Sequence, residues 1–138
     1  MDDSSGLPLL VHWTISQGSP PAPVTVIETP EFLPATRKLM DEAERAKLVD
    51  YLARNPAAGN LIPGTGGVRK LRWGLEGRGK RGGARVIDFY HDPGIPLFAL
   101  TAYTKNAQAD LSAADRNTFR RLTKVLVESY EWQSRQSG

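Results

Sequence analysis

The sequence has no cysteine, only two histidines and no long apolar run. The missing cysteines exclude a disulfide scaffold, a zinc site built on thiolates and a cysteine nucleophile. Because His12 and His91 lie far apart in the chain, we expect neither a bound metal nor another cofactor. No apolar segment approaches the roughly 18 residues needed to cross a bilayer. We therefore expect an intracellular, cytoplasmic protein without a membrane partner.

Acidic residues are scarce in one stretch, residues 64–85, which has the sequence GTGGVRKLRWGLEGRGKRGGAR and Glu76 as its only acid. The formal net charge is only +3, so the positive charge is concentrated in this stretch. Cations among flexible glycines suit contact with an anionic polymer. The alternative interpretation is a solvated basic hairpin without a ligand. The cations are Arg69, Lys70, Arg72, Arg78, Lys80, Arg81 and Arg85.

The length of 138 residues predicts a single domain. Residues 1–23 are interpreted as an N-terminal extension, because the prolines that follow Ser19 can continue neither a helix nor a central strand. We expect this extension to be flexible or to cover an edge of the domain formed by residues 24–138.

The first half of the domain predicts a strand and two helices. Val24–Ile27 is a short β-branched run, typical of a strand. Thr29 and Pro30 form a good helix start, although Pro34 limits that helix to a few residues. Asp41 begins a capping-box pattern, so we expect a second helix from there to about Arg54.

The second half predicts three strands and a final helix. The strands are Val68–Trp73, Ala84–Tyr90 and Leu97–Thr104, joined by turns at Gly74–Gly83 and His91–Pro96. The helix follows a cap at Ser112 and carries an apolar stripe of Phe119, Leu122, Leu126 and Tyr130. The order β-α-α-β-β-β-α predicts an α+β fold, with an antiparallel sheet and the helices on one of its faces.

Two glycine patterns resemble nucleotide-binding motifs, and the sequence around them argues against both. Gly77 to Gly82 matches GxGxxG, but a β-branched strand follows where the dinucleotide fingerprint needs a helix. Gly64 to Gly67 lacks the Lys-Ser/Thr ending of a phosphate-binding loop and also precedes a strand. We therefore interpret both patterns as turns.

Side-chain alternation along residues 68–73 sorts the cations by face. Lys70 and Arg72 share one face of that strand, and Arg69 lies on the other. Antiparallel pairing then places Arg85 and Lys105 close to Lys70 and Arg72, so we expect these four cations to converge on an exposed face of the sheet. The alternative is that they are ordinary outward-facing residues of a half-solvated sheet.

The stretch GTGGVRKLRWGLEGRGKRGGARVIDFY, with TAYTKNAQADLS after it, resembles the HigB branch of the RelE/ParE toxin superfamily. The resemblance covers roughly Val24 to Leu126. It implies a RelE-like small ribonuclease fold and an mRNA interferase, an endoribonuclease that cuts mRNA on the translating ribosome. It also implies a cognate helix-turn-helix antitoxin of the HigA type.

The resemblance also implies roles for individual residues. Arg85 matches the phosphate-stabilising arginine, Lys70 and Arg72 match a pair of cations on the preceding strand, and Lys105 matches the basic residue after the last strand. Cleavage would proceed by attack of the ribose 2′-hydroxyl without a metal. Residues expected to bind RNA are Arg69, Arg78, Lys80, Arg81 and Tyr103, although Tyr103 could equally be a buried residue of the sheet.

The sequence departs from the best-known RelE enzymes because no tyrosine near its C-terminus matches a catalytic one. Tyr130 lies on the apolar stripe and is expected in the core, and His91 lies in a turn far from Arg85. Two alternatives therefore remain: a ParE-like inhibitor of DNA gyrase, and a toxin-derived module that binds antitoxin and operator DNA. The cluster of Lys70, Arg72 and Arg85 favours cleavage.

Overall fold

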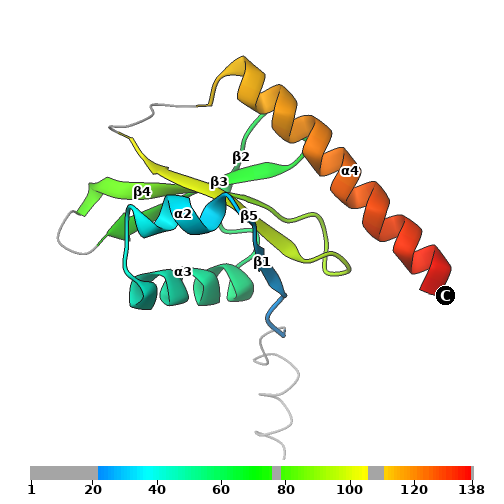
Figure 1. Cartoon of the computed structure of the whole chain (residues 1–138), viewed down its shortest axis with the longest axis horizontal. Coiled ribbons are helices and arrows are strands. Elements are labelled where there is room, and N and C mark those ends of the chain that lie inside the picture. Colours follow the sequence, from blue (N-terminus) through cyan, green and yellow to red (C-terminus); the bar gives the residue numbers. More distant parts are fainter. Residues whose placement is uncertain (1–21, 76–78, 106–110, 138) are drawn as a thin grey trace, which may run out of the picture.

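The computed structural model describes residues 22–75, 79–105 and 111–137, and the predicted N-terminal extension lies almost wholly outside them. The described elements follow the predicted order, with one additional short strand (Figure 1). They are β1 (Val26–Glu28), α2 (Phe32–Arg37), α3 (Glu42–Arg54), β2 (Asn60–Leu61), β3 (Val68–Leu75), β4 (Gly79–Phe89), β5 (Leu97–Thr104) and α4 (Ala113–Ser137).

The described strands form one five-stranded sheet with the order β1-β5-β4-β3-β2. The predicted antiparallel meander is confirmed, because β4 pairs antiparallel with both β3 and β5. β1 instead pairs parallel with β5. The sequence analysis missed β2, whose two residues add an antiparallel edge to β3 by pairing Asn60 with Lys70 and Leu61 with Arg69.

Helices cover both faces of the sheet, so the prediction of a single covered face was wrong (Figure 1). On one face, Phe32 of α2 and Leu48 of α3 pack with Leu71 and Val86. On the other face, α4 packs over a core that includes Val68, Ile87 and Phe89. The physical reason lies in β5, where Leu97–Leu100 is a continuous apolar run, which is typical of a strand buried on both faces.

Of the two helix caps predicted in the first half of the domain, one is confirmed and the other is wrong. Asp41 caps α3, since its side chain accepts a hydrogen bond of 2.8 Å from the backbone N–H of Glu44. The prediction that Thr29 caps the first helix was wrong. Its hydroxyl donates to the carbonyl oxygens of Ala99 and Leu100 at 2.9 and 3.1 Å, and therefore fastens the chain to β5.

The strands β3 and β4 extend into the segment that was predicted to be a turn, because Gly74, Leu75 and Gly79 belong to strands. The register shifts between Trp73 and Leu75, a bulge that lets the glycine-rich segment continue the ladder. A Cβ atom at Gly83 would lie only 2.5 Å from the carbonyl oxygen of Trp73, so the two strands approach too closely for any side chain. The GxGxxG pattern thus leads into a strand, as its sequence context indicated.

A compact turn, residues 62–67, attaches β3 to α4. The Thr65 hydroxyl donates to the Ile62 carbonyl oxygen at 2.6 Å and accepts from the Val68 N–H at 3.1 Å. Thr123 of α4 donates its hydroxyl to the Thr65 carbonyl oxygen at 3.2 Å. Gly66 has a φ of 79°, and a Cβ there would lie 2.4 Å from the Thr123 hydroxyl oxygen. This turn fixes the position of α4 relative to β3.

Candidate functional site

Three of the four cations predicted to be catalytic lie together on the α4 face of the sheet. Arg72 pairs with Arg85 across β3 and β4, and Arg85 pairs with Tyr103 across β4 and β5. Residues paired across strands share a face, and Lys70 lies on it two positions before Arg72. The predicted grouping of Lys70, Arg72 and Arg85 on one face agrees with the observed register. The prediction that this face is exposed was wrong for Arg85, because α4 packs on the same face and Arg85 is buried.

The three cations differ in burial. Arg72 is exposed and Lys70 is half-buried, whereas Arg85 is only 6% exposed. Among the described residues, the Nη1 atom of Arg85 is buried and has no hydrogen-bond partner. A buried guanidinium is costly unless an anion or an acceptor compensates its charge. An anion beside Arg72 and Arg85 would compensate this charge.

Lys105 lies in a turn one residue after β5 and is exposed. Its neighbour Thr104 pairs with Ala84, the residue before Arg85, so Lys105 is at the same end of the sheet as the other three cations. The prediction was that all four cations converge on one face, and the register places Lys105 only at the same end of the sheet as the other three.

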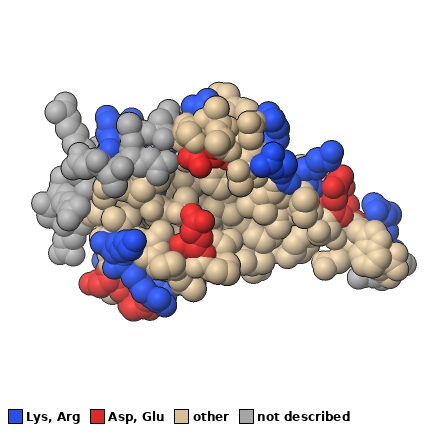
Figure 2. Space-filling view, turned by 45° about the horizontal axis from the view of Figure 1, so that its top comes forward, with Lys and Arg blue, Asp and Glu red and all other residues tan. Residues whose placement is uncertain are grey.

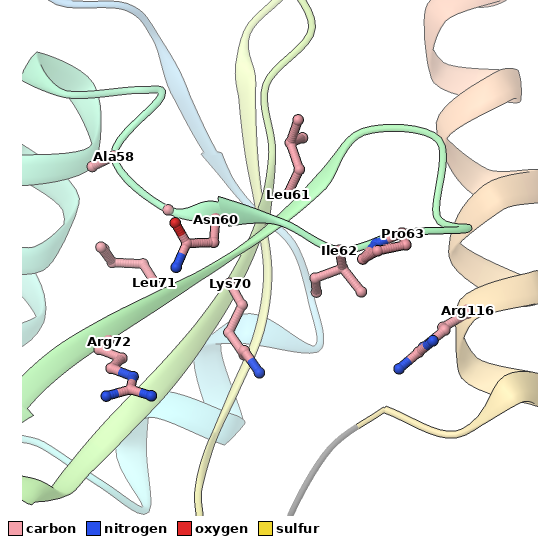
Figure 3. A pocket seen from close by; sticks show the side chains of 10 residues that line it. Ala58, Asn60, Leu61, Ile62, Pro63, Lys70, Leu71, Arg72 and Arg116 are labelled. Carbon is pink, nitrogen blue, oxygen red and sulfur yellow. The ribbon is translucent and has the colours of Figure 1, made fainter.

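A pocket of about 480 Å³ lies beside this cluster, between the β2–β3 edge and α4. Figure 3 shows Lys70 and Arg72 of β3, and Arg116 of α4, directed toward the same space. Asn60 lines the pocket from β2, directly opposite Lys70 in the register. None of the described residues that line it is acidic. The pocket therefore offers cations from two elements that are distant in the sequence.

The sequence analysis did not identify Arg116 or Asn60. A signal for Arg116 was present, because it precedes Phe119 by three residues and Thr123 by seven, and so continues the inward stripe of the helix by one turn. Asn60 had no such signal, since its position follows from a strand of only two residues.

Cationic side chains also gather along α4 outside this pocket. In Figure 2, Lys and Arg side chains stand along the upper right of the molecule, where α4 runs, with acidic side chains between them. The helix begins at the predicted cap, because the Ser112 hydroxyl oxygen accepts a hydrogen bond of 3.1 Å from the Asp115 N–H. Phe119, Leu126 and Tyr130 pack on the sheet as expected, whereas Leu122 is 36% exposed and Thr123 is buried in its place.

Arg69 is not brought together with the other predicted RNA-binding residues. It lies on the α2–α3 face, and its Nη1 atom donates to the carbonyl oxygens of Ala57 and Gly59 at 3.3 and 2.8 Å. These bonds hold the segment that leads into β2 and the pocket. Arg69 thus lies on the opposite face of the sheet from Lys70 and Arg72, as the strand alternation predicted, and holds the segment before β2 by these bonds.

Asp88 lies opposite Arg69 in the register and is only 1% exposed. Among the described residues, neither of its carboxyl oxygens has a hydrogen-bond partner. Burial raises the pKa of the Asp88 carboxyl to about 7, and the nearby charge of Arg69 opposes part of that rise. This titratable group is on the opposite face from Arg72 and Arg85.

The remaining predicted RNA-binding residues have mixed outcomes. Tyr103 is 9% exposed and belongs to the core cluster, so the alternative of a buried sheet tyrosine describes its position. Arg78 lies outside the described residues. Lys80 and Arg81 belong to β4 by their backbone, and their side chains also lie outside the described part.

His91 is exposed and follows the far end of β4, with its Nε2 atom 3.6 Å from an Asp92 carboxyl oxygen. Within residues 22–75, 79–105 and 111–137, no group of three potential ligands is arranged to hold a metal ion. In the same described ranges, no helix is long and apolar enough to span a membrane.

Comparison with protein families places these features in a known context. Residues 35–136 match the family model described as the RelE toxin of the RelE / RelB toxin-antitoxin system. The match includes α3, the whole β2–β5 region with its cationic cluster, and nearly all of α4. It also implies an antitoxin as a partner. Since this match spans well over half of the chain, the protein belongs to the RelE toxin family.

Proposed function

We propose that this toxin is a ribosome-dependent mRNA endonuclease that cleaves RNA without a metal. The observation that carries the proposal is the shared row of Arg72 and Arg85, with Lys70 beside it and Arg85 buried. Two like charges directly opposite each other destabilise a sheet, unless a ligand of opposite charge lies between them. An RNA phosphate is such a ligand.

In the proposed reaction, the ribose 2′-oxygen forms a bond to the adjacent phosphorus while the bond from phosphorus to the 5′-oxygen breaks. The base takes the 2′-hydroxyl proton, and the leaving 5′-oxygen takes a proton from water. The products are a 2′,3′-cyclic phosphate and a 5′-hydroxyl. Negative charge builds on the phosphoryl oxygens, and cations already in place stabilise it.

The three cations suit different parts of this step. Arg72 and Arg85 hold the phosphoryl oxygens, because a guanidinium offers a planar set of donors. An arginine does not lose its proton in a protein, so Lys70 is the only one of the three that can act as the base. Lys105, at the same end of the sheet, is proposed as a further contact to the RNA phosphate.

Dependence on the ribosome is part of the proposal. His91 is separated from Arg85 by six residues of extended chain, about 20 Å, and therefore cannot share a phosphate with it. With limited acid–base groups near the cations among the described residues, substrate positioning must supply much of the rate. The ribosome can supply that positioning, and this implies a cytoplasmic site of action.

The test is to map mRNA 5′ ends and to measure growth arrest after induction of the wild type, Lys70→Ala and Arg85→Ala. Loss of one preorganised donor should lower the cleavage rate by roughly 100-fold or more. Lys47→Ala, an exposed lysine of α3, is the matched control and should cleave like the wild type. Unchanged arrest in both site variants would show that this face is not catalytic. Intact messages accompanied by DNA damage would instead favour the gyrase alternative.

We also propose that the antitoxin is of the helix-turn-helix, HigA type and that it covers the cationic face. The charge of Lys70, Arg72 and Arg85 supports this, because an acidic segment bound there would prevent contact with RNA. A complex that still binds RNA as tightly as the free toxin would contradict the proposal.

A further inference from the structure

The pocket beside the Arg72–Arg85 pair has features that cleavage of one phosphate does not require. Its volume of about 480 Å³ is within the range of small-ligand sites. Arg85 does not line it, whereas Arg116 and Asn60 do. It therefore extends from Arg72 away from Arg85, toward α4 and the edge strand β2.

Arg116 is held at a fixed position relative to β3. It lies two turns before Thr123 on α4, so both residues occupy the same side of the helix. Thr123 is buried and bonds to the Thr65 carbonyl oxygen, and Gly66 fits against it. The half-buried Arg116 is thereby presented to the pocket by the fold and directed toward the side of Lys70 (Figure 3).

Asn60 contributes a different kind of group from the facing edge. It is exposed, pairs with Lys70 in the register and lines the same pocket as Lys70 and Arg72, and Figure 3 shows its amide beside Leu71. A carboxamide has both donors and an acceptor, and so can pair with the edge of a base. Cations that hold phosphates, beside an amide that reads a base, form a combination suited to one nucleotide of single-stranded RNA.

We propose that this pocket is a nucleotide subsite, next to the nucleotide whose phosphate is cleaved. Arg116 binds the backbone phosphate of the bound nucleotide, and Asn60 contacts its base. The inference rests on the proposed endonuclease function for its position relative to the cleaved bond. It predicts that α4 takes part in RNA binding and that the short β2 strand contributes to sequence preference.

The phosphate contact can be tested without cleavage. Binding of a short single-stranded RNA with 2′-O-methyl groups is measured by fluorescence anisotropy over a range of KCl concentrations. Arg116→Ala should lower the affinity about tenfold and reduce the slope of log affinity against log salt by about 0.7. Arg116→Lys should retain most of that slope. Arg121→Ala, an exposed arginine of the same helix that does not line the pocket, is the matched control.

The base contact has a separate readout. Phosphate contacts position a nucleic acid, whereas base contacts specify its sequence. In cleavage maps, Arg116→Ala should therefore reduce cutting evenly at all sites, whereas Asn60→Ala should redistribute it among sequences. Asn117→Ala, an exposed asparagine of α4, should leave the distribution unchanged.

The outcomes separate this inference from the function on which it rests. If the wild type cleaves mRNA but Arg116→Ala and Arg121→Ala bind RNA equally well, the subsite is wrong and the endonuclease stands. If salt-dependent binding requires Arg116 but no message is cut, the subsite stands and the endonuclease is wrong. An unchanged cleavage pattern in Asn60→Ala would overturn the base contact.

Discussion

Two cross-strand pairs on the same two strands have opposite character. Arg69 pairs with Asp88 on the α2–α3 face, and Arg72 pairs with Arg85 on the α4 face. The first pair combines opposite charges and bonds its arginine to backbone carbonyl oxygens. The second combines like charges, and the buried Nη1 of its Arg85 has no acceptor among the described residues. Among the described residues, the first pair also has buried atoms without a partner, namely the Arg69 Nε and both Asp88 carboxyl oxygens. The two pairs therefore differ in charge: the first combines a cation with an acid, whereas the second places two cations opposite each other, which suits an anion.

A first contrast is expected between Arg69→Met and Arg85→Met. Arg69→Met removes charged hydrogen bonds to Ala57 and Gly59 and should lower the free energy of unfolding by about 2–3 kcal/mol. Arg85→Met removes a like charge and an uncompensated buried group, so the free energy of unfolding should be unchanged or higher. Urea unfolding without RNA measures both. Equal losses would show that Arg85 serves the fold rather than a ligand.

The second contrast concerns how the free energy of unfolding depends on pH through Asp88. Its pKa in the folded protein is about 7, above the ordinary value of 3.8, so the native state retains a proton that the unfolded state releases. Stability from this proton is complete below about pH 4 and is lost as the pH rises to 7, by up to about 1.4 kcal/mol per pH unit. Asp88→Asn should remove this fall. The measurement is urea unfolding at pH 4 to 8, and parallel curves for the two proteins would contradict the assignment.

The smallest effect tests the attachment of α4. Gly64 and Gly66 have nearly equal φ angles of 80° and 79°, but only a Cβ at Gly66 would collide with Thr123. Gly64→Ala should therefore cost about 1 kcal/mol from backbone strain alone, and Gly66→Ala somewhat more. Thermal unfolding compares the two. If the proposed subsite depends on a fixed α4, Gly66→Ala should also weaken RNA binding, and equal binding by both variants would argue against that dependence.

Much of this structure could be predicted from local patterns. The cap at Asp41, the cap at Ser112 and the strand Leu97–Thr104 all agree with the sequence analysis, because each depends on neighbouring residues alone. The shared face of Lys70, Arg72 and Arg85 also follows from side-chain alternation and hairpin pairing.

The missed features depend on contacts between distant segments. β2 is two residues long, too short to show any periodicity, and forms only because β3 offers an unpaired edge. The hydroxyl of Thr29 suits a helix cap, but it bonds instead to acceptors on β5 that lie 70 and 71 positions further along the chain. The burial of Arg85 and the approach of Arg116 likewise arise from packing that no local pattern specifies.

The last turns of α4 have a practical consequence. Residues 131–136 are exposed, beyond the contact of Tyr130 with Phe98. The sequence has no cysteine, so Arg135→Cys would provide a single thiol for a fluorescent label. That thiol would be about 30 Å along the helix from Arg116, at 1.5 Å per residue. A label there could report by energy transfer when a dye-bearing RNA reaches the pocket, without occupying the pocket itself.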